Sequence, residues 1–483
     1  MKLKSLKFIL IFSIVVNSLF AQDTTVLTFN QFYQLVASHH PIAKQAALLP
    51  EMAKSQVIMA KGSFDPVLQV EYDSKLTKGI NSYEYVDPEI KIPTLTGIDF
   101  KAGVDKSSGA SVNPEIGKFD PLTGKTIDVN YSLLYAGFNF PVLRGLLTDQ
   151  RRNELKQARI LVDLNQAEQV KIVNKLFLSA SKDYWTWLSA YQKYNYIKEG
   201  YLLAQNRLSY IKSRIKEGEE KPIDSVEAFI ELKRREVLLA ESNLELMNAR
   251  TLLSAYIWDA NNNPVMLTTL TIPAASGSQV VVINSDTLSR LISYAIQLHP
   301  EMQKFNYKIG QLQLDKKLAI ENLKPQLNVS YYPFQTYTNG TSDEVAGLFS
   351  KNYKLGVSFK SSLFLRKERG KLQLTTLKVK ETAYAQQIGK RELSNQVIVA
   401  YNELENMELM RNLQQTLVDN AALLRSAELQ RFEAGESSLF LVNQRERALL
   451  DAQSKLAEMI AKYAFAKSNL YFSAGLQTPS LND

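Results

Sequence analysis

Arg431-Phe432-Glu433-Ala434-Gly435 is the stretch that decides the fold of this chain. No proline occurs between Gln335 and this stretch, and apolar residues recur at helical spacing before it. A helical pattern resumes after Ser437 and Ser438, which are both favourable helix N-cap residues. Gly435 is therefore predicted to be the left-handed residue at the end of one long helix, where the chain reverses into a second helix.

The same turn pattern occurs earlier, at Arg214-Ile215-Lys216-Glu217-Gly218, which lies 217 residues before the first. Tyr184 and Tyr401 have this separation too, as do Leu253 and Leu470. A constant offset over about a hundred positions is typical of an internal duplication. The chain is thus predicted to contain two copies of a long antiparallel helix hairpin.

A second offset locates an insertion in the first repeat. His40-Pro41 and His299-Pro300 each interrupt a helical pattern ahead of a hairpin, and they lie 259 residues apart. The offsets of 259 and 217 differ by 42 residues, which we place in the first repeat after Tyr72. Turn-forming residues are frequent there, so we expect a long surface loop. Residues 98–104 alternate like a strand, but we assign them to this extracellular loop, because a barrel that starts and ends on one side needs an even strand count.

Four segments change from a helical period to the period of two that is typical of strands: 67–76, 127–140, 326–337 and 353–360. In the first of them Leu68, Val70 and Tyr72 alternate with Gln69 and Glu71. The sheet is therefore expected to have one apolar and one polar face. A water-soluble sheet would show the same alternation, although the tyrosines and phenylalanines also suit the aromatic girdles of a membrane barrel.

The N-terminus has the pattern of a secretory signal peptide. Lys2, Lys4 and Lys7 precede an apolar run over 8–20, and Ala21 offers a small residue for cleavage. This run is too short for a spanning helix, so we predict export and removal of residues 1–21. An uncleaved anchor is the alternative.

Composition excludes several classes of function. The 483-residue chain has no cysteine, which rules out thiol catalysis, cysteine-ligated metals and a lipoprotein anchor. A net charge of +8 is too mild to indicate nucleic-acid binding. We expect no catalytic residues, no cofactor and no metal. His39, His40 and His299 are the only histidines, and a helix-boundary role before proline is favoured over metal binding. Trp185 and Trp187 are expected to pack inside the long helices.

The arrangement resembles the TolC family of bacterial outer-membrane efflux proteins (outer membrane factors). The two hairpin tips carry the resemblance, together with Leu449-Leu450-Asp451-Ala452-Gln453 and the ending over 466–475. It implies a mainly α fold with β, in which duplicated long helix hairpins form a coiled-coil α-helical barrel. Two strands per repeat would then contribute to a trimeric, 12-stranded outer-membrane β-barrel. Four strands alone cannot close a barrel, and two, three or four copies would satisfy that requirement; the resemblance selects three.

The resemblance also implies a function and partners. The chain would be a homotrimeric exit duct of a tripartite efflux or type I secretion system in the outer membrane of a Gram-negative bacterium, with a large periplasmic portion. Its partners would be outer-membrane lipid, a periplasmic adaptor (membrane fusion) protein and an inner-membrane transporter of RND or ABC type, with no nucleic acid. Contact with the adaptor would be made at the tips, by Arg214, Gly218, Asp224, Arg431, Gly435 and Glu436.

One departure concerns the tip. The family often has an aspartate six residues after the tip glycine, as Asp224 is after Gly218, but Leu441 takes that place after Gly435. An acidic ring at the periplasmic mouth is therefore not predicted here. An exported structural coiled-coil protein without a pore remains an alternative; an exported enzyme has no site to support it.

These patterns divide the chain as follows: signal peptide 1–21; first repeat 22–258, with its hairpin tip at 214–224; linker 259–284; second repeat 285–475, with its tip at 431–441; tail 476–483.

Overall fold

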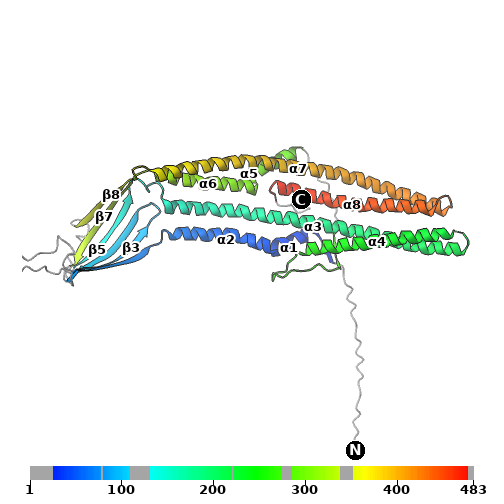
Figure 1. Cartoon of the computed structure of the whole chain (residues 1–483), viewed down its shortest axis with the longest axis horizontal. Helices are drawn as coiled ribbons and strands as arrows, with labels where there is room; N and C mark the ends of the chain where they lie inside the picture. Colours follow the sequence, from blue (N-terminus) through cyan, green and yellow to red (C-terminus); the bar gives the residue numbers. More distant parts are fainter. Residues whose placement is uncertain are drawn as a thin grey trace, which may run out of the picture.

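The computed structural model describes residues 25–77, 80–108, 131–219, 221–274, 285–337 and 352–476. The molecule is long and narrow, with a β-sheet at one end and the turns of two helix hairpins at the other (Figure 1). The predicted signal peptide, residues 127–130 of a predicted strand, and residues 477–483 of the tail lie outside the described residues.

Two helices span most of the length. α3 (Gln150–Lys216) has 67 residues and α7 (Arg366–Glu433) has 68. At a rise of ~1.5 Å per residue, each is about 100 Å long. They turn into the return helices α4 (Pro222–Ser254) and α8 (Leu439–Ser473), so both predicted hairpins are present.

A pair of shorter helices precedes each hairpin: α1 (Phe29–His39) with α2 (Pro41–Gly62), and α5 (Ser285–Leu298) with α6 (Pro300–Glu321). His40 Nδ1 accepts a hydrogen bond from the N–H of Ile42, and His299 Nδ1 accepts one from that of Glu301, both at 3.1 Å. Each histidine is thus the N-cap of a helix that begins with proline, which confirms the predicted helix-boundary role. Two short strands, β1 (Thr25–Leu27) and β6 (Thr271–Pro273), pair in parallel beside the first of these helix pairs.

The main core lies at mid-length, where α1 packs against α3 and α4. Trp187 and Tyr184 of α3 are completely or almost completely buried, and the Tyr184 ring stacks on Phe32 of α1 at 5.5 Å. Trp185 is buried in the same cluster, as predicted. Because the apolar seam of α3 is covered by its neighbours, packing rather than intrinsic helix propensity holds these helices.

The sheet has six antiparallel strands in the order β2-β3-β4-β5-β7-β8. They are β2 (Val67–Thr77), β3 (Ile80–Pro93), β4 (Asp99–Ser108), β5 (Tyr131–Pro141), β7 (Gln326–Tyr337) and β8 (Tyr353–Lys360). The prediction that the insertion is a surface loop, with 98–104 inside it, is wrong. The insertion contributes β3 and β4, so the first repeat supplies four strands to this sheet rather than two.

The misassignment has a physical cause at Asp87-Pro88, a dipeptide typical of turns. Both residues lie inside β3, at a place where no β3–β4 residue pairs are formed, so the missing N–H of Pro88 is tolerated. Side-chain hydrogen bonds hold the strand there: the hydroxyls of Tyr85 and Tyr135 donate to the Asp87 carboxylate at 3.1 and 3.0 Å. One partner on β3 itself and one on β5 thus override the local turn preference.

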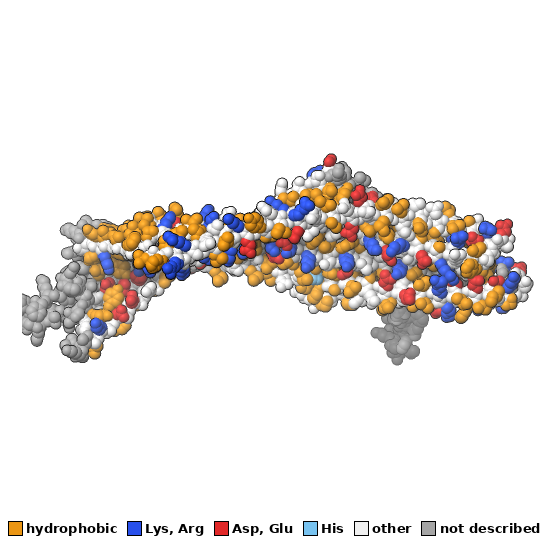
Figure 2. Space-filling model, turned by 45° about the horizontal axis from the view of Figure 1, so that its top comes forward, with side chains coloured by type: hydrophobic (Ala, Val, Ile, Leu, Met, Phe, Trp, Pro, Cys, Tyr) orange, Lys and Arg blue, Asp and Glu red, His pale blue; other side chains and the backbone are white. Residues whose placement is uncertain are grey.

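The sheet exposes its apolar side chains and buries charged ones, which is the opposite of a water-soluble sheet. Apolar side chains on one face are exposed, with Leu68 71% and Val357 67% accessible. On the other face, Asp87 and Glu89 are only 9% and 8% accessible, and Lys101 donates to Glu89 at 2.8 Å. Hydrophobic side chains gather at this end of the molecule in Figure 2. Among the described residues, no helix is both long and apolar enough to cross a membrane.

Candidate functional site

The candidate site is the pair of hairpin tips, which lie together at the end opposite the sheet (Figure 1). Gly218 has φ of 80° and Gly435 has φ of 76°, which confirms the predicted left-handed turns. After α3, the N–H of Glu219 donates to Arg214 O at 3.0 Å; after α7, that of Glu436 donates to Arg431 O at 2.8 Å. The two tips therefore share one turn geometry.

Each return helix is capped at its start. The Asp224 carboxylate accepts a hydrogen bond from the N–H of Lys221 at 3.2 Å, and the Ser438 hydroxyl accepts one from the N–H of Leu441 at 3.4 Å. Asp224, singled out because of its distance from Gly218, therefore has a capping role at the start of α4.

The other predicted tip residues lie on the surface. Arg214 donates to Glu219 at 3.1 Å and to the Tyr210 hydroxyl at 3.2 Å. The side chains of Arg431 and Glu436 are exposed on the second tip. A small apolar cluster joins the two tips beneath this surface, with Ile211 from α3, Ala228 from α4, Phe432 from α7 and Val442 from α8, together with Leu208 and Leu439.

Above this cluster, Glu446 of α8 links all four long helices. The carboxylate is 3% accessible and accepts hydrogen bonds from Arg207 of α3 at 2.5 and 2.7 Å. Arg235 of α4 also donates to it at 2.7 Å, and Arg425 of α7 lies 3.3 Å away. These are charge-assisted hydrogen bonds, in a bidentate geometry for Arg207.

A second buried carboxylate extends the network. Glu231 of α4 accepts from Arg235 Nε at 2.9 Å and from Arg447 Nε of α8 at 2.8 Å. Arg235 also donates to the carbonyl oxygen of Gly200 at 2.7 Å. Charges removed from water are costly unless they are paired, so this network fixes how one hairpin sits against the other close to the tips.

The arginines also set the charge state of Glu446. Burial alone would raise the pKa of this carboxyl, but hydrogen bonding to Arg207 and the positive charges of Arg207 and Arg235 outweigh it and lower the pKa to about 2. Glu446 therefore stays ionised at neutral pH.

Sequence reasoning did not find this network. The only local signal is the i,i+4 spacing of Glu231 and Arg235, which is common on solvated helix surfaces. The partners of Glu446 are separated from it by up to 239 residues, as for Arg207, so they become neighbours only once both hairpins are folded.

The histidines are placed as helix caps rather than as members of a metal or catalytic site. His40 and His299 cap different helices in different repeats. No group of three or more His, Asp or Glu side chains in the described part of the chain is arranged to hold a metal ion.

Residues 291–476 match the sequence model of a family described as outer membrane efflux protein. No curated protein sequence shows significant similarity to the chain. Among solved structures, the fold resembles the CmeC outer membrane channel of Campylobacter jejuni, at 14% identity over 93% of this chain and 86% of that one, with a TM-score of 0.61. It also resembles the outer membrane protein VceC of Vibrio cholerae, at 13% identity over 93% and 96% of the two chains, with a TM-score of 0.61. The MtrE outer membrane channel of Neisseria gonorrhoeae, in its open state, matches at 13% identity over 93% and 90%, with a TM-score of 0.60.

The family match covers most of the second repeat, and the structural matches cover 93% of the chain. Residues 291–476 thus match the outer membrane efflux protein family, in agreement with the resemblance of the whole sequence to the TolC family.

Proposed function

We propose that this protein is an outer-membrane channel that carries substrates across the outer membrane and through the periplasm, as the exit duct of a tripartite efflux or type I secretion system. One observation carries the proposal: a sheet with an exposed apolar face continues directly into helix hairpins about 100 Å long, and neither of its edge strands has an outer partner among the described residues. The apolar face suits lipid, and the hairpins are long enough to reach far into the periplasm.

The sheet edges indicate how copies of the chain would assemble. β2 and β8 form the two edges, and because all neighbours are antiparallel, these two strands run in opposite directions. β8 of one copy can therefore pair antiparallel with β2 of the next while all copies keep one orientation in the membrane. Such a head-to-tail contact closes into a ring, and unpaired edges are not tolerated in lipid.

Three copies of the six-stranded sheet would supply eighteen strands. The twelve strands expected from sequence assumed two strands per repeat, and β3 and β4 add the remaining six. Barrel diameter grows with strand number, so this hairpin would widen the membrane portion relative to a twelve-stranded barrel.

The tips are the part that partners at the inner membrane would reach. We place contact with a periplasmic adaptor protein at Arg214, Gly218, Asp224, Arg431, Gly435 and Glu436, and the adaptor would connect the channel to an inner-membrane transporter of RND or ABC type. Support comes from the exposed Arg431 and Glu436 side chains and from the position of both tips at the end away from the sheet.

Planar-bilayer recordings test this function. Protein extracted from the outer membrane with detergent should give discrete conductance steps, whereas a coiled-coil protein without a pore would wash off the membrane and give none. Gly218→Val and Gly435→Val should change the step size or the open fraction, because a β-branched residue in a left-handed conformation costs about 1–2 kcal/mol. A Cβ atom at either glycine meets no heavy atom within 4 Å, so the effect is confined to the turn.

The amount of protein in the outer membrane is the control for both variants and should equal the wild type. Steps identical to the wild type would show that the tips are ordinary turns. Absence of steps from the wild type would contradict the channel itself.

A further inference from the structure

The two connections from the sheet to the long helices expose pairs of apolar residues. Leu146 and Leu147, between β5 and α3, are 39% and 70% accessible. Leu363 and Phe364, between β8 and α7, are 92% and 67% accessible. The second pair lies 217 residues after the first, which is the offset of the duplicated hairpins. Exposed apolar residues at the same place in both repeats indicate that both pairs meet an apolar environment.

Both connections lie at the end of the sheet from which the long helices start (Figure 1). In the proposed channel this end is the boundary between the membrane and the periplasm, where apolar side chains can enter the headgroup region of the lipid. β5 has a strand on each side within the sheet, so a copy that pairs at β2 or β8 does not cover Leu147. Lipid, rather than a neighbouring chain, is therefore an environment that both pairs can share.

The arginines of the first connection are already engaged. Arg151 forms an ion pair with Asp99 at 3.0 Å, and Arg152 donates to the carbonyl oxygen of Leu146 at 3.0 Å. In the second repeat, by contrast, residues 366–371 contain four Lys or Arg and one Glu. The two connections thus share an apolar pair but differ in charge.

Arg366 and Lys367, which follow the second apolar pair, have exposed side chains and form no ion pair with any described residue. The Arg366 guanidinium lies over the Phe364 ring, 5.0 Å from its centroid. Cations in the first turn of a helix are disfavoured by the helix dipole, so their position at the start of α7 lowers the stability of the helix. A positive charge held beside an exposed apolar group matches a phosphate group above acyl chains.

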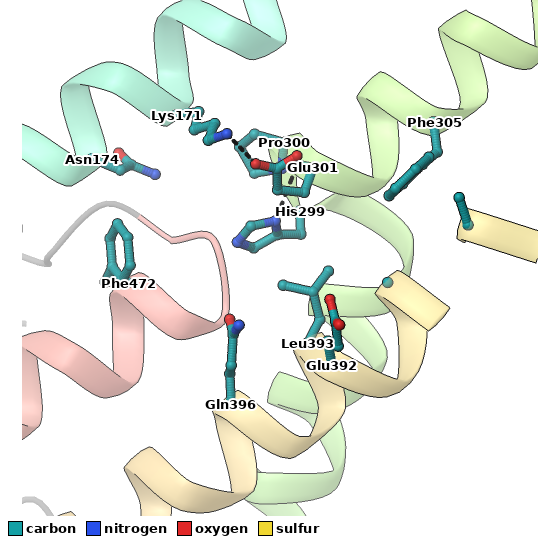
Figure 3. Close-up of a pocket in the computed structure, with 12 residues that line it drawn as sticks. Lys171, Asn174, His299, Pro300, Glu301, Phe305, Glu392, Leu393, Gln396 and Phe472 are labelled. Atoms are coloured by element: carbon teal, nitrogen blue, oxygen red, sulfur yellow. Dashed lines mark hydrogen bonds and ion pairs between the residues drawn. The ribbon is translucent and has the colours of Figure 1, made fainter. Parts of the chain in front are cut away.

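Between residues 366 and 410, the excess of cations is confined to the part of α7 near the sheet. Residues 366–380 have six Lys or Arg and one Glu, whereas residues 381–410 have two Lys or Arg and five Glu. At mid-length, Lys171 of α3 pairs with Glu301 of α6, and Glu392 of α7 lines the same cavity (Figure 3). The unpaired cations thus gather where α7 would meet the headgroups.

We propose that the connection from β8 to α7 binds an anionic phospholipid, in the leaflet on the helix side of the membrane. Arg366 and Lys367 would pair with the phosphate group, and Leu363 and Phe364 would lie among the acyl chains. The connection from β5 to α3 would contact lipid without this preference for charge. The inference rests on the proposed function, because it requires the sheet to lie in the membrane.

Native mass spectrometry of the full chain in detergent tests the proposal with two lipids that carry the same acyl chains, phosphatidylglycerol and phosphatidylcholine. We expect an apparent Kd at least about tenfold lower for phosphatidylglycerol, because each Lys or Arg near an anionic headgroup adds electrostatic attraction. Equal binding of the two lipids would overturn the proposal. Conductance steps are recorded from the same preparation: equal binding with steps present rejects the lipid site alone, whereas absence of steps rejects the channel.

Variants assign the preference to the named cations. Arg366→Gln combined with Lys367→Gln should raise the apparent Kd for phosphatidylglycerol about tenfold and leave that for phosphatidylcholine unchanged. Lys378→Gln combined with Lys380→Gln removes the same charge from exposed positions about 18 Å farther along α7 and should change neither Kd. An equal loss in both double variants would show a response to net charge alone and would contradict the site.

Phe364→Ser tests the apolar part of the site. It should weaken the binding of both lipids alike, because it removes an apolar contact and no charge, and the number of chains in the oligomer should not change. Dissociation of this variant into single chains would show that Phe364 contacts a neighbouring copy, and would overturn its assignment to lipid.

Discussion

Val70→Lys is expected to remove the protein from the outer membrane as an assembled species. Val70 is the fourth of the eleven residues of β2, and its side chain is 61% accessible on the apolar face. A lysine on the lipid face of a membrane barrel costs about 2–4 kcal/mol at the midplane, and every copy in the ring would carry one. The measurement is the amount of detergent-resistant oligomer in outer-membrane fractions.

Gln69→Lys is the matched control, because it places the same charge on the adjacent residue of β2, which faces the polar side. Its register partner on β3 is Glu89, so the new lysine meets a carboxylate. This variant should assemble like the wild type. If both variants assembled equally well, or if Gln69→Lys alone failed, the apolar face would not be the lipid face.

Glu446→Ala should loosen the two hairpins against each other near the tips. The change removes the carboxylate that pairs with the part-buried Arg207, and one of the two carboxylates that pair with the buried Arg235. Removing one partner of a buried ion pair typically costs about 3–5 kcal/mol. We expect a lower thermal-unfolding temperature and faster proteolysis of residues around Gly218 and Gly435, with the sheet unaffected.

Glu458→Ala is the control on the same helix. Glu458 pairs with Lys455 at 2.9 Å, but both side chains are well exposed, so the loss should be under about 1 kcal/mol. The folded-state pKa of Glu446 is about 2, below its ordinary 4.5, so the wild-type network is fully formed above pH 4.5 and is lost only as the pH falls through 2. Equal effects of the two substitutions would show that the network does not hold the hairpins.

The hairpins could be predicted from sequence because their signals are local. Gly435 and Gly218 mark left-handed ends, and the absence of proline permits long helices between them. The duplication gave a second line of support, because the same turn pattern occurs at the same place in both repeats. The roles of His40 and His299 at helix boundaries could be predicted because each is followed directly by a proline.

The additional strands were missed because their stability is not local. The apolar alternation over Val86, Ile90 and Ile92 is present in the sequence, but Asp87-Pro88 interrupts it with a turn signal. Tyr135, which satisfies both Asp87 and Glu89, comes more than forty residues later. The Glu446 network was missed for the same reason, since it depends on helices that meet only in the folded chain.

In the proposed channel, β8 of one copy pairs with β2 of the next to close a ring of three. The chain has no cysteine, so any disulfide that forms must join the introduced cysteines. Within one chain, β2 and β8 are separated by five strand spacings, or roughly 24 Å along the sheet, whereas a disulfide needs Cα atoms within about 7 Å.

A β2–β8 disulfide must therefore join two chains. Val70→Cys is combined in turn with Leu355→Cys, Val357→Cys and Phe359→Cys, which lie on the same apolar face of β8, and oxidised outer membranes are analysed by non-reducing gel electrophoresis. We expect one combination to yield a covalent species of three chains and nothing larger, and reduction to return this species to single chains. A product that stops at two chains, or no cross-linking in any combination, would contradict the ring of three.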